Sequence, residues 1–171
     1  MRSKSFKRLL ALATASLYVL SLGQVALAET EDPDSAPQAL VGSWTVQVTQ
    51  VNCQNGAALG SPFLSLLTFE RGGTIVETTS NPMFFPALRG PGHGVWTHDR
   101  QGFKAVSVAF ITLNGVLTKT QTITQWIEIG RDGDSFTTTS ASIVLVPEGG
   151  SPTITGCATA AGKRIEIRGR E

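Results

Sequence analysis

The chain has 171 residues, with 14 Lys and Arg and 13 Asp and Glu. Four of the basic residues but none of the acidic ones lie within residues 1–28, so the remainder of the chain carries a formal net charge of −3. That remainder has no basic patch or arginine-rich stripe, and we therefore expect no nucleic-acid partner.

Residues 1–28 have the three parts of a secretory signal peptide. A basic segment, residues 2–8, is followed by an apolar run, Leu9–Leu22, and then by Ala26-Leu27-Ala28, which fits a cleavage site. An uncleaved membrane anchor is the alternative, but the apolar run is short and contains polar residues. No later apolar run could cross a bilayer. The sequence therefore predicts a secreted or periplasmic protein with no membrane span after signal cleavage.

Residues 29–39 are acidic and contain two prolines, as expected of a disordered leader. The rest, residues 40–171, is predicted to form one domain. Eight segments of this domain are rich in β-branched and aromatic residues, which favour strands. Turn residues separate them, most clearly Asn114-Gly115, because both of these residue types tolerate positive φ in a tight hairpin. The predicted strands are Gly42–Thr49, Phe63–Phe69, Thr74–Thr79, His93–Asp99, Phe103–Leu113, Val116–Ile129, Ser135–Val146 and Thr153–Ile167.

Eight consecutive strands without a crossover helix predict an all-β fold, an antiparallel up-and-down barrel closed by pairing of the first and last strands. A two-sheet sandwich is the alternative, although sandwiches usually need Greek-key connections. Cys53 follows the first strand and Cys157 lies early in the last one. A disulfide between them would fit both barrel closure and export. Gly156 and Gly162 are candidates for β-bulges in the last strand.

The first strand opens with Gly42-Ser43-Trp44, which resembles the Gly-x-Trp motif of lipocalins in the calycin group of barrels. Avidins and the small allene-oxide-cyclase-like barrels are similar in architecture. The resemblance implies that Trp44 packs across the closed end of the barrel against a late basic residue, for which Arg164 or Arg168 matches. Independently, directly opposed cysteines would place Trp44 against Glu166, with both arginines beside it.

The loop after Thr79 is the strongest candidate for a functional element. Met and aromatic residues lie between prolines in this loop, and we expect a lid or a plug at one barrel end with at least one Phe ring facing the lumen. The hydroxyl-rich faces of Val116–Ile129 and Ser135–Val146 either line a ligand cavity or face solvent. The candidate ligand-binding residues are Met83, Phe84, Phe85, Trp96, Thr120, Thr122, Trp126 and Phe136.

Candidates for acid–base catalysis are His93, His98 and Glu128. The odd spacing of the two histidines points them to opposite faces of a strand, which disfavours a shared metal site. We expect no metal and no cofactor. The segment Phe103–Leu113 is apolar on both faces, so its outer face is a candidate to pack against the leader, a loop or a second subunit as a homo-oligomer.

These patterns favour a secreted, non-catalytic barrel whose partner is a small hydrophobic molecule, either apolar or amphipathic. One alternative is a cofactor-free cyclase or isomerase that acts on a hydrophobic substrate inside the barrel. The other is a structural or inhibitory protein that uses its outer surface for interactions.

Overall fold

A computed structural model describes residues 38–167 of the chain. The predicted signal peptide, most of the predicted leader and Arg168 lie outside these residues. The described elements are β1 (Gly42–Val51), β2 (Phe63–Phe69), β3 (Thr74–Thr79), the short 3-10 helix η1 (Pro82–Phe84), β4 (Leu88–Arg89), β5 (Gly92–Asp99), β6 (Gly102–Leu113), β7 (Val116–Ile129), β8 (Ser135–Pro147) and β9 (Thr153–Arg164).

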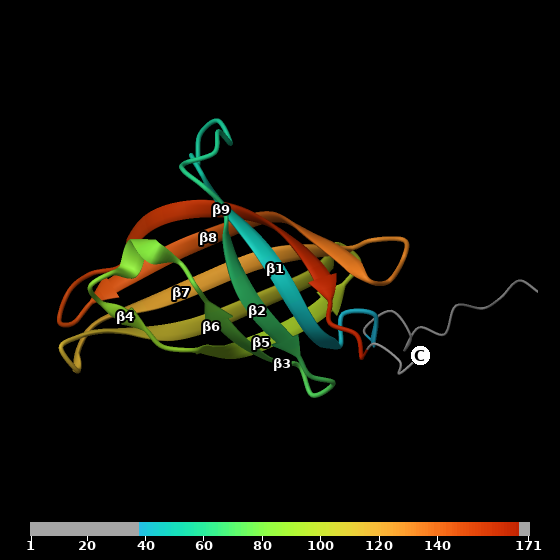
Figure 1. Cartoon of the computed structure of the whole chain (residues 1–171), viewed down its shortest axis with the longest axis horizontal. Coiled ribbons are helices and arrows are strands. Elements are labelled where there is room, and N and C mark those ends of the chain that lie inside the picture. The colour runs from blue at the N-terminus through green and yellow to red at the C-terminus, as the bar shows by residue number, and fades with distance from the viewer. Residues whose placement is uncertain (1–37, 168–171) are drawn as a thin grey trace, which may run out of the picture. The chain divides into compact units, whose positions relative to one another are not determined.

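The strands form a closed antiparallel barrel (Figure 1). Around the ring the order is β1, β2, β3, β5, β6, β7, β8 and β9, and β9 pairs again with β1. This closed ring of eight confirms the predicted fold class and is consistent with a calycin-like fold. The two-residue strand β4 is additional to the ring and pairs with the end of β6 at Ile111 and Thr112. Neither β4 nor η1 was predicted, because both are very short and lie in a proline-rich loop.

The β6–β7 hairpin illustrates how the local sequence sets the fold. Its turn residues Asn114 and Gly115 have φ angles of 52° and 79°, the conformation for which Asn-Gly is suited. In β6 the residues alternate between buried and more exposed positions, and Phe103 and Ala105 point into the barrel. A half-buried strand requires this period of two.

Five aromatic rings fill one end of the barrel, which we call the closed end. The rings of Trp44 and Phe136 lie 5.0 Å apart edge to face, and those of Phe69 and Trp96 lie 6.2 Å apart. Phe103 completes the cluster against Trp96. All five side chains are buried, so this end of the lumen is a packed core.

Arg164 seals the closed end from outside the aromatic cluster. Its guanidinium carbon lies 4.2 Å from the ring centroid of Trp44, and its Nε donates to Asp134 Oδ1 at 3.0 Å. It also donates to the carbonyls of Ala39 and Val41 at 2.8 and 2.7 Å, which ties the segment before β1 to the last strand. The contact with Trp44 is the one that the lipocalin resemblance implies.

The register between β1 and β9 differs from the predicted one by two residues. Trp44 pairs with Arg164, whereas directly opposed cysteines would have placed it against Glu166. A shift of two keeps every side chain on the same face of the sheet. The pairing also runs through Gly162 without a bulge. Gly162 provides space instead, because a Cβ there would clash with the ring of Phe136.

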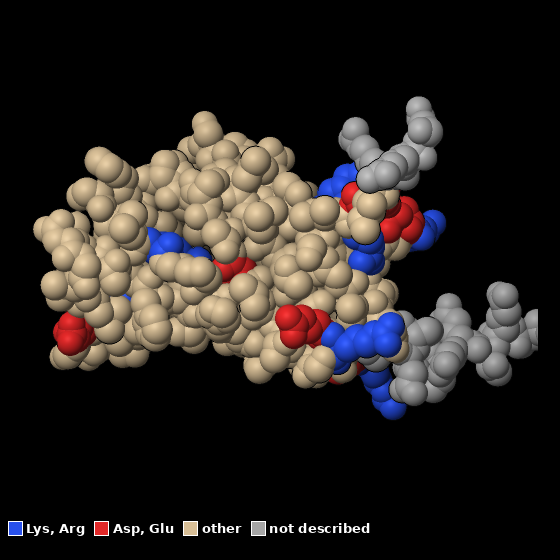
Figure 2. Space-filling model, turned by 60° about the horizontal axis from the view of Figure 1, so that its bottom comes forward, with Lys and Arg blue, Asp and Glu red and all other residues tan. Residues whose placement is uncertain are grey.

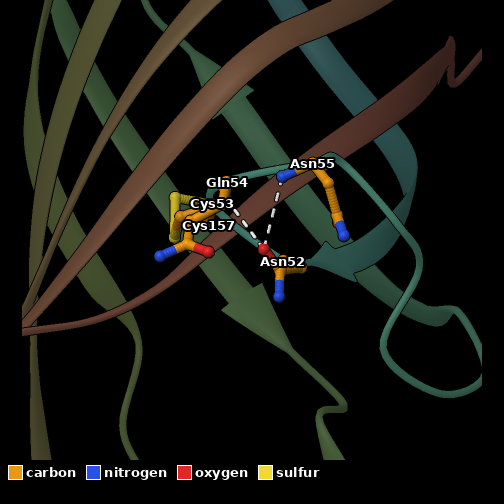
Figure 3. Close-up of a disulfide and its surroundings, with 5 residues drawn as sticks. All are labelled: Asn52, Cys53, Gln54, Asn55 and Cys157. Atoms are coloured by element: carbon orange, nitrogen blue, oxygen red, sulfur yellow. Dashed lines mark hydrogen bonds between the residues drawn. A yellow bond between two sulfur atoms is a disulfide. The ribbon is translucent and has the colours of Figure 1, made fainter.

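Cys53 and Cys157 form the predicted disulfide, with Cα atoms 5.2 Å apart (Figure 3). Beside the bond, Asn52 Oδ1 accepts hydrogen bonds from the backbone N–H groups of Gln54 and Asn55 at 2.8 and 3.3 Å. These bonds shape the turn that carries Cys53 toward β9. Disulfides are typical of proteins in oxidising, extracytoplasmic compartments.

Charge is distributed unevenly along the barrel. On the face shown in Figure 2, charged side chains gather toward the right-hand end, and most of the remaining surface is uncharged. In the sequence, the turns at the closed end contain several charged residues, including Glu70 and Arg71, Asp99 and Arg100, and Arg131, Asp132 and Asp134. None of the helices within residues 38–167 is long and apolar enough to span a membrane.

Candidate functional site

Two adjoining chambers occupy the lumen between the aromatic cluster and the other end of the barrel, which we call the open end. The inner chamber has a volume of about 60 Å³ and the outer chamber about 520 Å³. They share the lining residues Asn81, Phe84, Gln121 and Ile143. Pockets for small molecules usually measure about 300–1,000 Å³, so the outer chamber is large enough for such a ligand.

Mostly apolar side chains form the wall of the outer chamber. They come from the loop between β3 and β4 and from the ends of β6 and β8 that face the open end. Such a wall suits the apolar part of a ligand, because burial of apolar surface drives binding. The principal apolar lining residues are Met83, Phe84, Ala87, Ile111, Leu113 and Leu145.

A buried ion pair lies in the wall of the inner chamber. The side chains of Arg89 and Glu77 are only 2% and 8% exposed, and Arg89 Nη2 donates to Glu77 Oε1. Arg89 also donates from Nε to Gln121 Oε1 and, at 3.2 Å, from Nη1 to the carbonyl of Gly90. Gly92 leaves room for the pair, since a Cβ there would lie 2.5 Å from Glu77 Oε1. The pair places two opposite charges where a ligand could contact them.

None of these polar residues was predicted from the sequence as a site residue. Glu77 lies two residues after Ile75, on the same buried face of β3, and this spacing of two was the one available signal for its inward position. Arg89 lies in β4, which was not predicted. Gln121 and Gln125 are both buried on the inner face of β7, although the opposite face of that strand was considered as the lumen lining.

Three predicted ligand-binding residues of β7 therefore lie on the outer face. Thr120, Thr122 and Trp126 alternate with the buried glutamines, and none of the three lines either chamber. Trp126 instead contacts Lys104 of β6, whose Nζ lies 5.2 Å from the ring centroid. Of the two alternatives stated for the even-numbered face of β7, the structure therefore shows the one in which it faces away from the lumen.

In β8, the even-numbered residues point into the barrel along only part of the strand. Phe136 and Thr138 are buried, but a shift in register lies between Thr138 and Ala141. Beyond it, odd-numbered residues such as Ile143 line the chambers. Phe136, like Trp96 of β5, belongs to the aromatic cluster and lines neither chamber.

The aromatic loop meets the lumen through one of its two rings. Phe84 lines both chambers, in agreement with the prediction that at least one ring faces the lumen. Phe85 is 87% exposed and lines neither chamber. Met83 lines the outer chamber although it is 76% exposed, so it lies at the rim.

The three candidates for acid–base catalysis are not brought together. His93 and Glu128 are exposed on the outer face, and the ring of His98 packs 4.5 Å from that of Phe103 at the closed end. None of the three lines the chambers. Among residues 38–167, no group of three His, Cys, Asp or Glu side chains is positioned to hold a metal ion.

Comparison with known proteins does not extend this description. No protein-family model matches the chain, and no curated protein matches it.

Proposed function

We propose that this protein is a secreted, non-catalytic barrel that binds a small apolar or amphipathic molecule in the outer chamber. The observation that carries the proposal is the cavity of about 520 Å³ with a largely apolar wall. The predicted signal peptide and the disulfide between Cys53 and Cys157 support export.

The rim of the cavity also favours an apolar partner. Met83 at the rim is mostly exposed, and Phe84 behind it is half-buried. A ligand that covered these side chains would remove apolar area from water, which stabilises a complex by about 25 cal/mol for each Å². Pro82 and Pro86 restrict the backbone on either side, so little entropy is lost when the loop holds this conformation.

Binding is favoured over catalysis by the position of the ionisable groups. His93, His98 and Glu128 do not line the chambers, Glu77 in the inner chamber is paired with Arg89, and Lys119 of the outer chamber is exposed to solvent. A cyclase or isomerase of a hydrophobic substrate needs an acid or base that can exchange a proton with it. A mutually neutralised pair is poorly suited to that role.

The test is a titration with the neutral fluorophore N-phenyl-1-naphthylamine, whose emission rises in apolar surroundings. Leu145→Trp would narrow the outer chamber and should weaken binding. Leu64→Trp makes the same change at an exposed position on the outer face and should leave binding unchanged. Absence of binding to the unsubstituted protein, or equal binding to both variants, would overturn the proposal. Native mass spectrometry of the exported protein would then identify a co-purified ligand.

A second candidate function rests on the outer surface of β6. Val108 and Phe110 remain exposed there, next to Val95 of β5, within the described part of the chain. A structural or inhibitory protein, or a homo-oligomer, would use such a surface for contact. Light scattering of the unsubstituted protein and of Phe110→Asp tests this role: a larger species that Phe110→Asp dissociates would support it, and a monomer in both cases would refute it.

A further inference from the structure

We infer that the inner chamber receives the head group of the ligand and selects a neutral, hydrogen-bonding group such as an alcohol or amide over a carboxylate. This inference rests on the proposed binding function and adds a chemical class to it. The inner chamber adjoins the outer one, and its volume of about 60 Å³ can hold on the order of a few water-sized groups. It is therefore a site for the end of a molecule whose body lies in the outer chamber.

Unpaired polar groups in the inner chamber indicate a hydrogen-bonding partner. Thr138 is 3% exposed, and its Oγ1 has no hydrogen-bond partner among the described residues. Gln125 is 6% exposed, and its amide makes no hydrogen bond within residues 38–167. Both side chains line the inner chamber. Buried polar groups in proteins are almost always paired, so these two are suited to a ligand that donates and accepts.

The ion pair adds further unused hydrogen-bonding capacity. A guanidinium has five N–H donors. Arg89 directs one donor each to Glu77, Gln121 and Gly90 through its three nitrogens, which leaves N–H groups on both terminal nitrogens. Glu77 Oε2 likewise accepts no hydrogen bond from the described residues. The inner chamber thus offers both donors and acceptors to a head group.

The charge balance of the inner chamber decides between head groups. Among residues 38–167, Arg89 and Glu77 are the only ionisable residues that line the inner chamber, and they compensate each other. A carboxylate would add a third charge in a buried site without a counter-ion, at a large desolvation cost. An alcohol or a primary amide can satisfy Thr138, Gln125 and the free donors of Arg89 without adding charge. A neutral head group is therefore favoured.

The test compares 1-dodecanol, dodecanamide and dodecanoate as competitors of N-phenyl-1-naphthylamine, at about pH 8, where the acid is ionised. The alcohol and the amide should each bind at least about ten times more tightly than the carboxylate. A site built for particular hydrogen bonds rejects a group that cannot make them. Glu77→Gln leaves the charge of Arg89 uncompensated and should shift the preference toward dodecanoate by about tenfold. Glu128→Gln makes the same change on the outer face and should leave the ranking unchanged.

Thr138→Val is a second test variant. Valine has nearly the shape of threonine but lacks its hydroxyl, so this variant tests the inference even if Glu77→Gln does not fold. It should weaken the binding of 1-dodecanol several-fold and leave the binding of dodecanoate unchanged. If dodecanoate competes as well as or better than the neutral ligands in the unsubstituted protein, the head-group inference fails while the proposed function stands. If the fluorophore itself does not bind, the proposed function fails and this inference fails with it.

Discussion

Arg164→Ala is the substitution that tests most directly what holds the barrel closed. Arg164 packs over Trp44 at the junction of the first and last strands, and it hydrogen-bonds to Asp134 and to the carbonyls of Ala39 and Val41. The substitution removes all of these contacts at once. It leaves backbone carbonyls without their donor and the face of Trp44 without its cover.

The expected loss is about 2–4 kcal/mol in the free energy of unfolding. A hydrogen bond to a charged group contributes about 1.5–3 kcal/mol, and such terms are not additive within one side chain. The cation–π contact adds about 0.5–1 kcal/mol. The bond to Asp134 contributes little, because that side chain is half exposed to water.

Urea unfolding followed by far-UV circular dichroism measures the loss. With an m value of about 2 kcal/mol/M, the midpoint should fall by roughly 1–2 M. Lys163→Ala, at the neighbouring exposed position, is the matched control and should change stability by less than about 0.5 kcal/mol. Arg164→Lys should recover little of the lost stability, because an ammonium group cannot reproduce the planar set of N–H donors of a guanidinium. Equal losses for Arg164→Ala and Lys163→Ala would refute the reasoning.

Three further predictions concern stability. Phe136→Ala should cost about 3–5 kcal/mol by the same urea assay, because the ring is fully buried in the aromatic cluster. Reduction of the disulfide, which joins residues 104 apart, should cost up to about 4–5 kcal/mol in the chain-entropy model, as measured by unfolding with and without reductant. The pKa of Asp132 lies below its ordinary value of 3.8, first because the Ser135 hydroxyl and then because the Asp134 backbone N–H hydrogen-bonds to the carboxylate. The stability from this group is therefore present above about pH 4 and lost as the pH falls through the folded-state pKa. An NMR titration should find this lowered pKa, and Asp132→Asn should reduce the loss of stability in acid.

Local signals in the sequence were sufficient to predict the barrel. Strand-forming residues, regularly spaced turns and the Asn114-Gly115 hairpin are properties of short segments, and each gave the correct element. Barrel closure followed from the number and order of the strands, with Cys53 and Cys157 as independent support. The register error of two residues arose from the assumption that the cysteines lie directly opposite each other.

The lumen could not be predicted in the same way, because its lining depends on long-range pairing. In β7 the odd-numbered face is the more apolar one, but Lys119, Gln121 and Gln125 interrupt it. The continuous run of threonines on the even-numbered face was therefore the candidate lining. In β8 the irregularity after Thr138 exchanges the two faces midway along the strand. Arg89 reaches Glu77 only because the proline-rich loop brings β4 alongside β6, and nothing local to Arg89 indicates that path.

Both ends of the described chain lie at the closed end of the barrel, on the right in Figure 1. Ala39 and Arg164 are joined there by a hydrogen bond, whereas Met83 and Leu145 line the chamber at the opposite end. An anchor or a fused domain attached before Gln38 or after Ile167 would therefore tether the barrel by its base and leave its mouth free. The protein could be immobilised through either end on a bead or sensor surface without obstructing the route by which a ligand enters.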